Sequence, residues 1–172
     1  QNLMWGLGQP FAGAAADRWG SGRVIAAGGI LYAGGLVLMS QAGHPAALHL
    51  SAGLMVGLGL AGCSFSIILA GVARVVPEER RSWAFGVVTA AGSLGQFLFA
   101  PLGQAFIEAY GWSAALLLIS VFAAMIVPLA APLRGRNDRG DAGSRAQTFG
   151  EALGEAAGHS GYRYLNAGFF VC

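Results

Sequence analysis

Long apolar runs, separated by short polar links, make up most of the chain. Asp, Glu, Lys and Arg are all missing from residues 1–16, 24–73, 82–107 and 109–133. A helix needs about 20 apolar residues to cross the hydrocarbon core of a bilayer, so the run 24–73 is long enough for two helices. The runs lack the strict alternation of polar and apolar positions that an outer-membrane barrel shows. The pattern therefore predicts an all-α, polytopic transmembrane helical bundle.

The runs and links also predict the domain organisation. Residues 1–132 are expected to form five membrane segments, at about 1–16, 24–42, 48–73, 83–107 and 113–132. Residues 133–160 are polar and Gly-rich at their start, and we expect a loop that includes a short amphipathic helix. Residues 161–172 would begin another membrane helix. Because the chain starts and stops within apolar runs, we expect it to be a fragment of a longer protein.

Composition and charge place these helices in a membrane with a defined orientation. The chain is 55% hydrophobic and 10% charged, whereas about a quarter of the residues of a soluble domain are charged. All ten basic residues are arginines, and they lie in the links 17–23 and 74–82 and from 134 onward. Basic residues accumulate on the cytoplasmic side of membrane proteins. We therefore expect a multi-pass protein of the cell membrane, surrounded by lipid, with cytoplasmic Arg-rich links and no nucleic-acid partner.

Several patterns that could indicate other chemistry are better explained by packing. The stretch "GLGLAG" at 57–62 fits a dinucleotide fingerprint, but it lacks the preceding strand and the later acidic residue. We expect its glycines, together with Gly53, to form a smooth face for helix packing. Cys63 and Cys172 lie in separate apolar segments and are expected to be inert thiols. No His, Cys or carboxylate cluster occurs at membrane depth, so we expect no metal, no cofactor and no enzyme activity.

The link "GAAADRWGSGR" at 13–23 contains the first charges of the chain. Gly20 and Gly22 could supply the positive φ angles of a tight reversal, and Gly13 could let a neighbouring helix approach closely. Asp17 would precede the next helix, where unpaired amides and the helix dipole stabilise a carboxylate. These features are also those of a simple turn held at the membrane surface by Arg18 and by the arginine that ends the link.

The same stretch resembles the signature loop G-x-x-x-D-R-x-G-x-R-R between helices 2 and 3 of the major facilitator superfamily. A glycine, Gly22, replaces the first residue of the final basic pair. The resemblance implies that the segments are helices 2 to 6 and the start of helix 7, with 133–160 as the central loop. It also implies that the loop is a cytoplasmic latch that pairs with the other half of the transporter. The matching positions are Gly13, Asp17, Arg18, Gly20 and Arg23.

Two further stretches narrow the resemblance to one branch of that superfamily. The sequence from "VVPEERRSW" to "EAYGW" (75–112) is similar to helices 4 and 5 of the monocarboxylate-transporter-like and oxalate-formate-antiporter-like branch. "FGEALGEAAGHSGYRYLNAGFFVC" (149–172) is similar to the entry into helix 7 of that branch. The resemblance implies a secondary transporter that works by alternating access on a small organic anion such as a monocarboxylate, with or without a coupled proton.

Candidate cavity-lining residues are polar positions within the apolar runs. Thr89, Ser93 and Gln96 are spaced i, i+4 and i+7, so they fall within about 40–60° of one another on a helix. Asn2 and Gln9 form a second pair at i, i+7. Hydrogen bonding of Ser and Thr to their own backbone is the structural alternative. A porter for drugs or sugars, or a receptor or scaffold without transport, remains the functional alternative.

Overall fold

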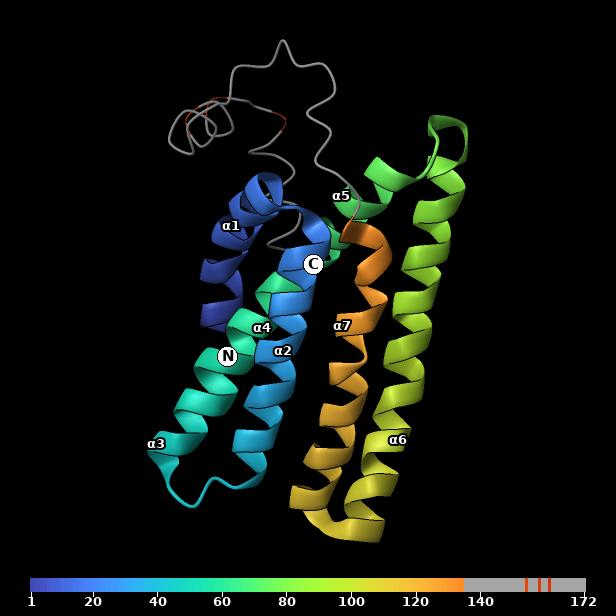
Figure 1. Ribbon diagram of the computed structural model, residues 1–172. Helices are drawn as coiled ribbons and strands as arrows, with labels where there is room; N and C mark the ends of the chain where they lie inside the picture. The colour runs from blue at the N-terminus through green and yellow to red at the C-terminus, as the bar shows by residue number, and fades with distance from the viewer. Residues whose placement is uncertain (135–153, 155–157, 159–160, 162–172) are drawn as a thin grey trace. The chain divides into compact units, whose positions relative to one another are not determined.

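The computed structural model describes residues 1–134 and, beyond them, positions 154, 158 and 161. The chain divides into two units, Gln1–Asn137 and Asp138–Cys172. The first unit is a bundle of helices whose long axes run roughly side by side (Figure 1). The amphipathic helix expected within 133–160 and the segment 161–172 fall almost wholly outside the described residues. Within the described part the structure is all-helical, without strands.

The first two helices are joined by one residue. Helix α1 (Asn2–Trp19) ends at Gly20, whose φ of 94° reverses the chain into α2 (Ser21–Ser40). Positive φ is accessible to glycine at little cost, and the amide of Gly20 donates to the Ala16 carbonyl at 2.9 Å. The predicted role of Gly20 is confirmed. The same prediction for Gly22 is wrong, because Gly22 lies in the first turn of α2 and the reversal is already complete.

The segment expected as one helix at 48–73 is interrupted. It begins as α3 (Pro45–Leu48), continues through the π-helical η1 (His49–Met55) and α4 (Val56–Gly62), and resumes as α5 (Phe65–Val75). Between α4 and α5, Cys63 leaves helical geometry and Ser64 is extended, with φ −63° and ψ 148°. Serine is favoured at a helix start, and its carbonyl here accepts from the amides of Ile67 and Ile68.

The remaining described helices form a hairpin. The 3₁₀ turn η2 (Glu78–Arg80) leads into α6 (Arg81–Ala124), in which Gly111 is non-helical, with φ 80° and ψ 165°. The chain reverses there, so α6 consists of a first arm, 81–110, and a second arm, 112–124 (Figure 1). The short α7 (Ile126–Leu129) and η3 (Ala131–Arg134) extend the second arm. Phe99 and Phe122 join the arms edge to face, with ring centroids 5.4 Å apart.

Helix α2 is the centre of the packing, and it lies very close to α4. A Cβ added to Gly59 would lie 2.7 Å from the Tyr32 amide nitrogen and 2.9 Å from the Gly28 carbonyl oxygen, both in α2. An added Cβ at Gly62 would also meet the backbone of Gly28. The predicted glycine packing face is therefore confirmed at these positions. It is not confirmed for Gly53, where an added Cβ would meet no atom of the described residues within 4 Å.

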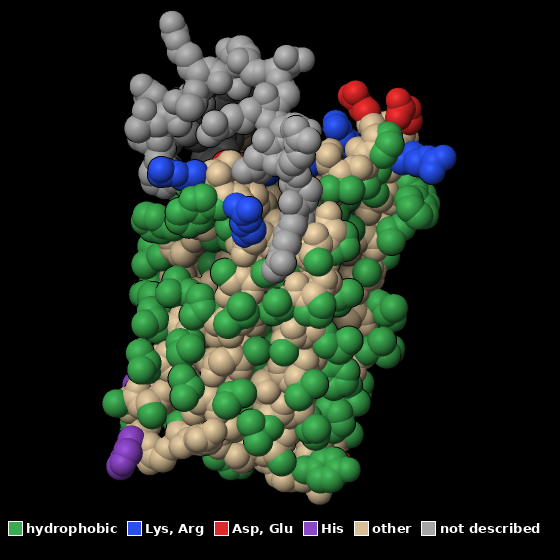
Figure 2. Space-filling view, in the orientation of Figure 1, with side chains coloured by type: hydrophobic (Ala, Val, Ile, Leu, Met, Phe, Trp, Pro, Cys, Tyr) green, Lys and Arg blue, Asp and Glu red, His purple; other side chains and the backbone are tan. Residues whose placement is uncertain are grey.

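The helices have the length and surface that a bilayer requires. The stretches Ser21–Ser40, Pro45–Val75 and Glu78–Leu133 are long and apolar enough to cross a membrane, and the last contains both arms of α6. Large apolar side chains such as Phe97, 75% exposed, cover the outside. Figure 2 shows arginines gathered at one end of the bundle and histidine at the other. A membrane-embedded protein has this distribution because lipid, and not water, surrounds its apolar middle.

Candidate functional site

An ion pair joins α1 to α5 at the arginine-rich end of the bundle. Asp17 lies in the last turn of α1 and Arg74 in the last turn of α5, and Nη2 of Arg74 is 2.8 Å from Oδ1 of Asp17. The expectation from the sequence that Asp17 precedes the start of the next helix and is stabilised there is therefore wrong, because Asp17 lies inside α1. A carboxylate at the C-terminal end of a helix is disfavoured by the dipole, whereas a guanidinium there is favoured. The pairing with Arg74 offsets the unfavourable position of Asp17.

The pair is exposed and makes a single contact. The side chain of Arg74 is 45% exposed and that of Asp17 is 76% exposed. Exposed pairs of this kind contribute about 0.2–1 kcal/mol. The pair therefore links two helix ends through a contact that costs little free energy to break.

A second arginine connects α5 to α6. Nε of Arg81, the first residue of α6, donates to the Ala73 carbonyl of α5 at 3.0 Å. The last carbonyls of a helix have no partner within the helix, and here the following Pro77 ends any continuation of α5. Arg81 supplies the missing donor across the link. The positions of Arg74 and Arg81 in the sequence indicated only membrane orientation, and nothing in the sequence pointed to these bonds.

Three other residues of the signature loop lie near the reversal between α1 and α2. Arg18 and Arg23 are exposed on either side of the reversal at Gly20. Gly13 was expected to admit a close neighbour, but a Cβ added there would meet no atom of the described residues within 4 Å. The described residues therefore supply no close neighbour for Gly13, and its role stays a prediction.

The candidate cavity-lining residues fall into two groups that the structure does not bring together. Thr89, Ser93 and Gln96 are exposed on the first arm of α6, and the Thr89 hydroxyl donates to the Phe85 carbonyl of its own helix at 2.8 Å. Asn2 and Gln9 belong to α1, at the opposite side of the bundle in Figure 1. The bond of Thr89 is the backbone hydrogen bond expected as the structural alternative, whereas no hydrogen bond of Ser93 or Gln96 to the described residues accompanies their exposure.

The described part of the chain contains no group of three or more His, Cys, Asp or Glu side chains that could hold a metal ion. Cys63 is half-buried at the break between α4 and α5, and its thiol donates to the Ile25 carbonyl at 3.5 Å. Cys172 lies outside the described residues.

Comparison with known proteins identifies the family of this bundle. The family model described as Major Facilitator Superfamily matches residues 3–168. The chain belongs to the major facilitator superfamily. This membership agrees with the signature loop at 13–23 and with the all-helical fold.

Curated relatives within the superfamily carry the name of one kind of transporter. Monocarboxylate transporter 13 of Rattus norvegicus is 38% identical over 128 residues, which are 74% of this chain and 29% of the relative. Monocarboxylate transporter 3 of Mus musculus is 36% identical over 118 residues (67% and 23%), and monocarboxylate transporter 11 of Mus musculus is 32% identical over 145 residues (84% and 32%). The chain spans less than a third of the length of these relatives.

Proposed function

We propose that the intact protein is a secondary active transporter that moves a small organic anion, such as a monocarboxylate, across the cell membrane by alternating access. We also propose that a proton is transported together with this anion, and the uptake experiment below tests this coupling. The family match and the names of the relatives support transport of a small molecule. The observation that carries the mechanism is the ion pair of the signature acid, Asp17, with Arg74 at the charged end of the bundle.

The charged end is assigned to the cytoplasm. The links at 17–23 and 74–82 meet at this end, and His44 and His49, the histidines of the described residues, lie at the other (Figure 2). The positive-inside rule supports the assignment because both links are short and lie within a few residues of helix ends. In this orientation, the reversal at Gly111 faces the exterior.

The signature loop is assigned the role of a conformational latch. Because Asp17 is 76% exposed and holds Arg74 through one contact, its carboxylate remains accessible to a second partner. A latch needs a contact that forms and breaks within a conformational cycle, and a weak exposed pair meets that need. In this latch, Asp17 and Arg18 pair with groups of the other half of the transporter when the latch is closed. Arg74 holds the Asp17 carboxylate when the latch is open.

The polar positions of α6 are assigned to the substrate path. Thr89, Ser93 and Gln96 are exposed on the first arm, and hydroxyl and amide donors are suited to a carboxylate. Transporters built from repeated halves bind substrate near the membrane midplane between the halves. We choose Gln96 as the principal contact because its amide has two donors to satisfy.

Uptake by the intact protein in liposomes tests the proposal. We expect accumulation of a radiolabelled short monocarboxylate, with competition by excess unlabelled carboxylates and none by sugars or neutral drugs. An imposed inward proton gradient should stimulate uptake if a proton is coupled. Competition by neutral solutes alone would favour the drug or sugar porter, and absence of any flux would favour a receptor or scaffold.

The latch is tested separately by Asp17→Asn, which keeps the shape of the side chain and removes its charge. We expect the maximal uptake rate to fall several-fold while substrate affinity changes less than two-fold, because the substitution acts on a conformational step. Glu78→Gln is the matched control, since Glu78 is an exposed carboxylate at the same end of the bundle. Equal maximal uptake rates in both variants and the wild type would refute the proposed latch without affecting the transport proposal.

A further inference from the structure

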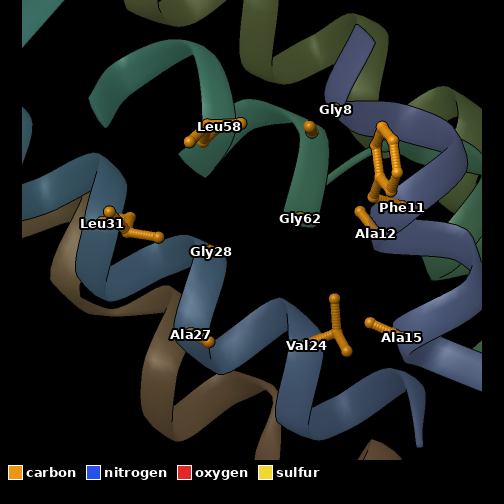
Figure 3. Close-up of a pocket in the computed structure, with 11 residues that line it drawn as sticks. Gly8, Phe11, Ala12, Ala15, Val24, Ala27, Gly28, Leu31, Leu58 and Gly62 are labelled. Carbon is orange, nitrogen blue, oxygen red and sulfur yellow. The ribbon is translucent and has the colours of Figure 1, made fainter. Parts of the chain in front are cut away.

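A groove runs along the outside of the bundle between α1, α2 and α4. Its volume is about 350 Å³, and residues 8–15 of α1, 24–31 of α2 and 58–62 of α4 contribute to its walls. Every side chain that lines it is apolar, and most are small. Figure 3 shows the side chains of Ala12, Ala15 and Val24 near one end and those of Leu31 and Leu58 toward the other. The groove is therefore a surface for hydrocarbon.

The length of the groove matches part of one membrane leaflet. The walls contributed by α1 and α2 each span seven residue steps, which is roughly 10 Å at 1.5 Å per residue. The hydrocarbon core of one leaflet is about 15 Å deep, half of about 30 Å. The groove thus follows about two thirds of one leaflet, starting at the end where α1 and α2 are joined.

That end of the groove is electropositive. Arg23 directly precedes the lining residue Val24 and is exposed in the first turn of α2. No acidic residue occurs in this turn, and no side chain of the described part caps it, so the N-terminal end of the helix dipole adds positive potential. The nearest carboxylate along the chain, Asp17, is paired with Arg74. An anion at the membrane surface is therefore favoured beside the open end of the groove.

We propose that the groove binds an anionic phospholipid, with one acyl chain between α1 and α2 and the phosphate beside Arg23 at the start of α2. Hydrocarbon chains alone give little preference, because lipid tails surround every helix face. Basic residues at the membrane surface supply the preference for an anionic headgroup, and the groove holds the chain next to them. The site is separate from the proposed substrate path on α6, although Arg23 also belongs to the signature loop.

Lipid retention by the intact protein tests this site. The protein is exchanged into vesicles of phosphatidylcholine with 30% phosphatidylglycerol, extracted in mild detergent, and its bound lipid is measured by native mass spectrometry. We expect one retained phosphatidylglycerol in preference to phosphatidylcholine. Arg23→Gln should lower its retention about five-fold, the equivalent of ~1 kcal/mol for one surface arginine. Arg80→Gln, an exposed arginine away from the groove, is the control and should retain lipid as the wild type does.

Filling the groove tests the acyl-chain part of the proposal. Ala27→Leu places a larger side chain at an exposed lining position and should lower retention of phosphatidylglycerol, whereas Ala124→Leu, at an exposed position of α6, should not. Equal retention of the two lipids, or unchanged retention in Ala27→Leu, would overturn the proposal. A cross-link from Ala27→Cys to another segment of the same polypeptide, without retained lipid, would overturn it in favour of a protein occupant.

Discussion

The contact between α2 and α4 makes a sharp stability prediction for Gly59→Ala. The new Cβ would lie 2.7 Å from the amide nitrogen of Tyr32, where ordinary contacts begin near 3.4 Å. The difference between 3.4 and 2.7 Å is 0.7 Å. All three atoms nearest to the new Cβ, the Tyr32 nitrogen and Cα and the Gly28 oxygen, belong to the backbone of α2, so no side chain can turn away. The two helices must therefore separate by several tenths of an ångström along their closest approach.

The size of the effect follows from two opposing terms. Overpacking of a tight interior costs about 1–3 kcal/mol, and a gap of 0.5–1 Å elsewhere along the contact removes a quarter to a half of each dispersion well. Alanine gains up to ~1 kcal/mol over glycine from helix propensity. Gly53→Ala gains a similar amount without the clash, because the described residues leave its Cβ position open. We therefore expect Gly59→Ala to be about 1–3 kcal/mol less stable than Gly53→Ala.

Equilibrium unfolding of the intact protein in mixed micelles, followed by tryptophan fluorescence as dodecyl sulfate is added, measures this difference. Comparing the two alanine variants removes most of the propensity term. Equal stabilities would refute the claim that the backbones of α2 and α4 are in contact at Gly59. A less stable Gly53→Ala would instead indicate that a further segment of the protein packs on that face.

Three other substitutions test separate contacts. Gln96→Leu should lower substrate uptake several-fold without changing the amount of folded protein, as judged by uptake in liposomes and gel filtration; unchanged uptake would remove Gln96 from the substrate path. Ser113→Ala removes the 2.6 Å bond from its hydroxyl to the Ser40 carbonyl, and we expect a loss of about 1 kcal/mol in the same unfolding assay. Arg81→Gln removes the donor to Ala73 and should speed hydrogen exchange in the last turn of α5, whereas exchange in α2 should stay unchanged.

Apolar patterning predicted the helical class because a chain that crosses a bilayer must hydrogen-bond its backbone groups internally, and a helix does this for every residue of a run. It could not locate the break at Cys63 and Ser64, since both residues lie within an uninterrupted apolar stretch and the break depends on backbone geometry. The reversal at Gly20 was predictable because only glycine accepts that φ angle at low cost. Its neighbour Gly22 has the same intrinsic freedom, and only the structure shows which of the two uses it.

The candidate site was less predictable than the fold. The partner of Asp17 is 57 residues away in the chain, and one sequence provides no rule that pairs two distant helix ends. A local sequence pattern also does not predict how each helix is rotated about its axis, and so which residues face a neighbouring helix. For this reason Gly59 and Gly53 look equivalent in the sequence, although one touches α2 and the other meets no described neighbour.

The bond from Arg81 to Ala73 has a consequence for how this end of the bundle can bend. It ties the first turn of α6 to the last turn of α5, whose Arg74 holds Asp17 at the end of α1. Three helix ends are thereby linked in series, and the link between α1 and α5 is the exposed pair that opens in the proposed latch. Flexing is then easiest where regular helix hydrogen bonding is interrupted, between Cys63 and Ser64 and at Gly111.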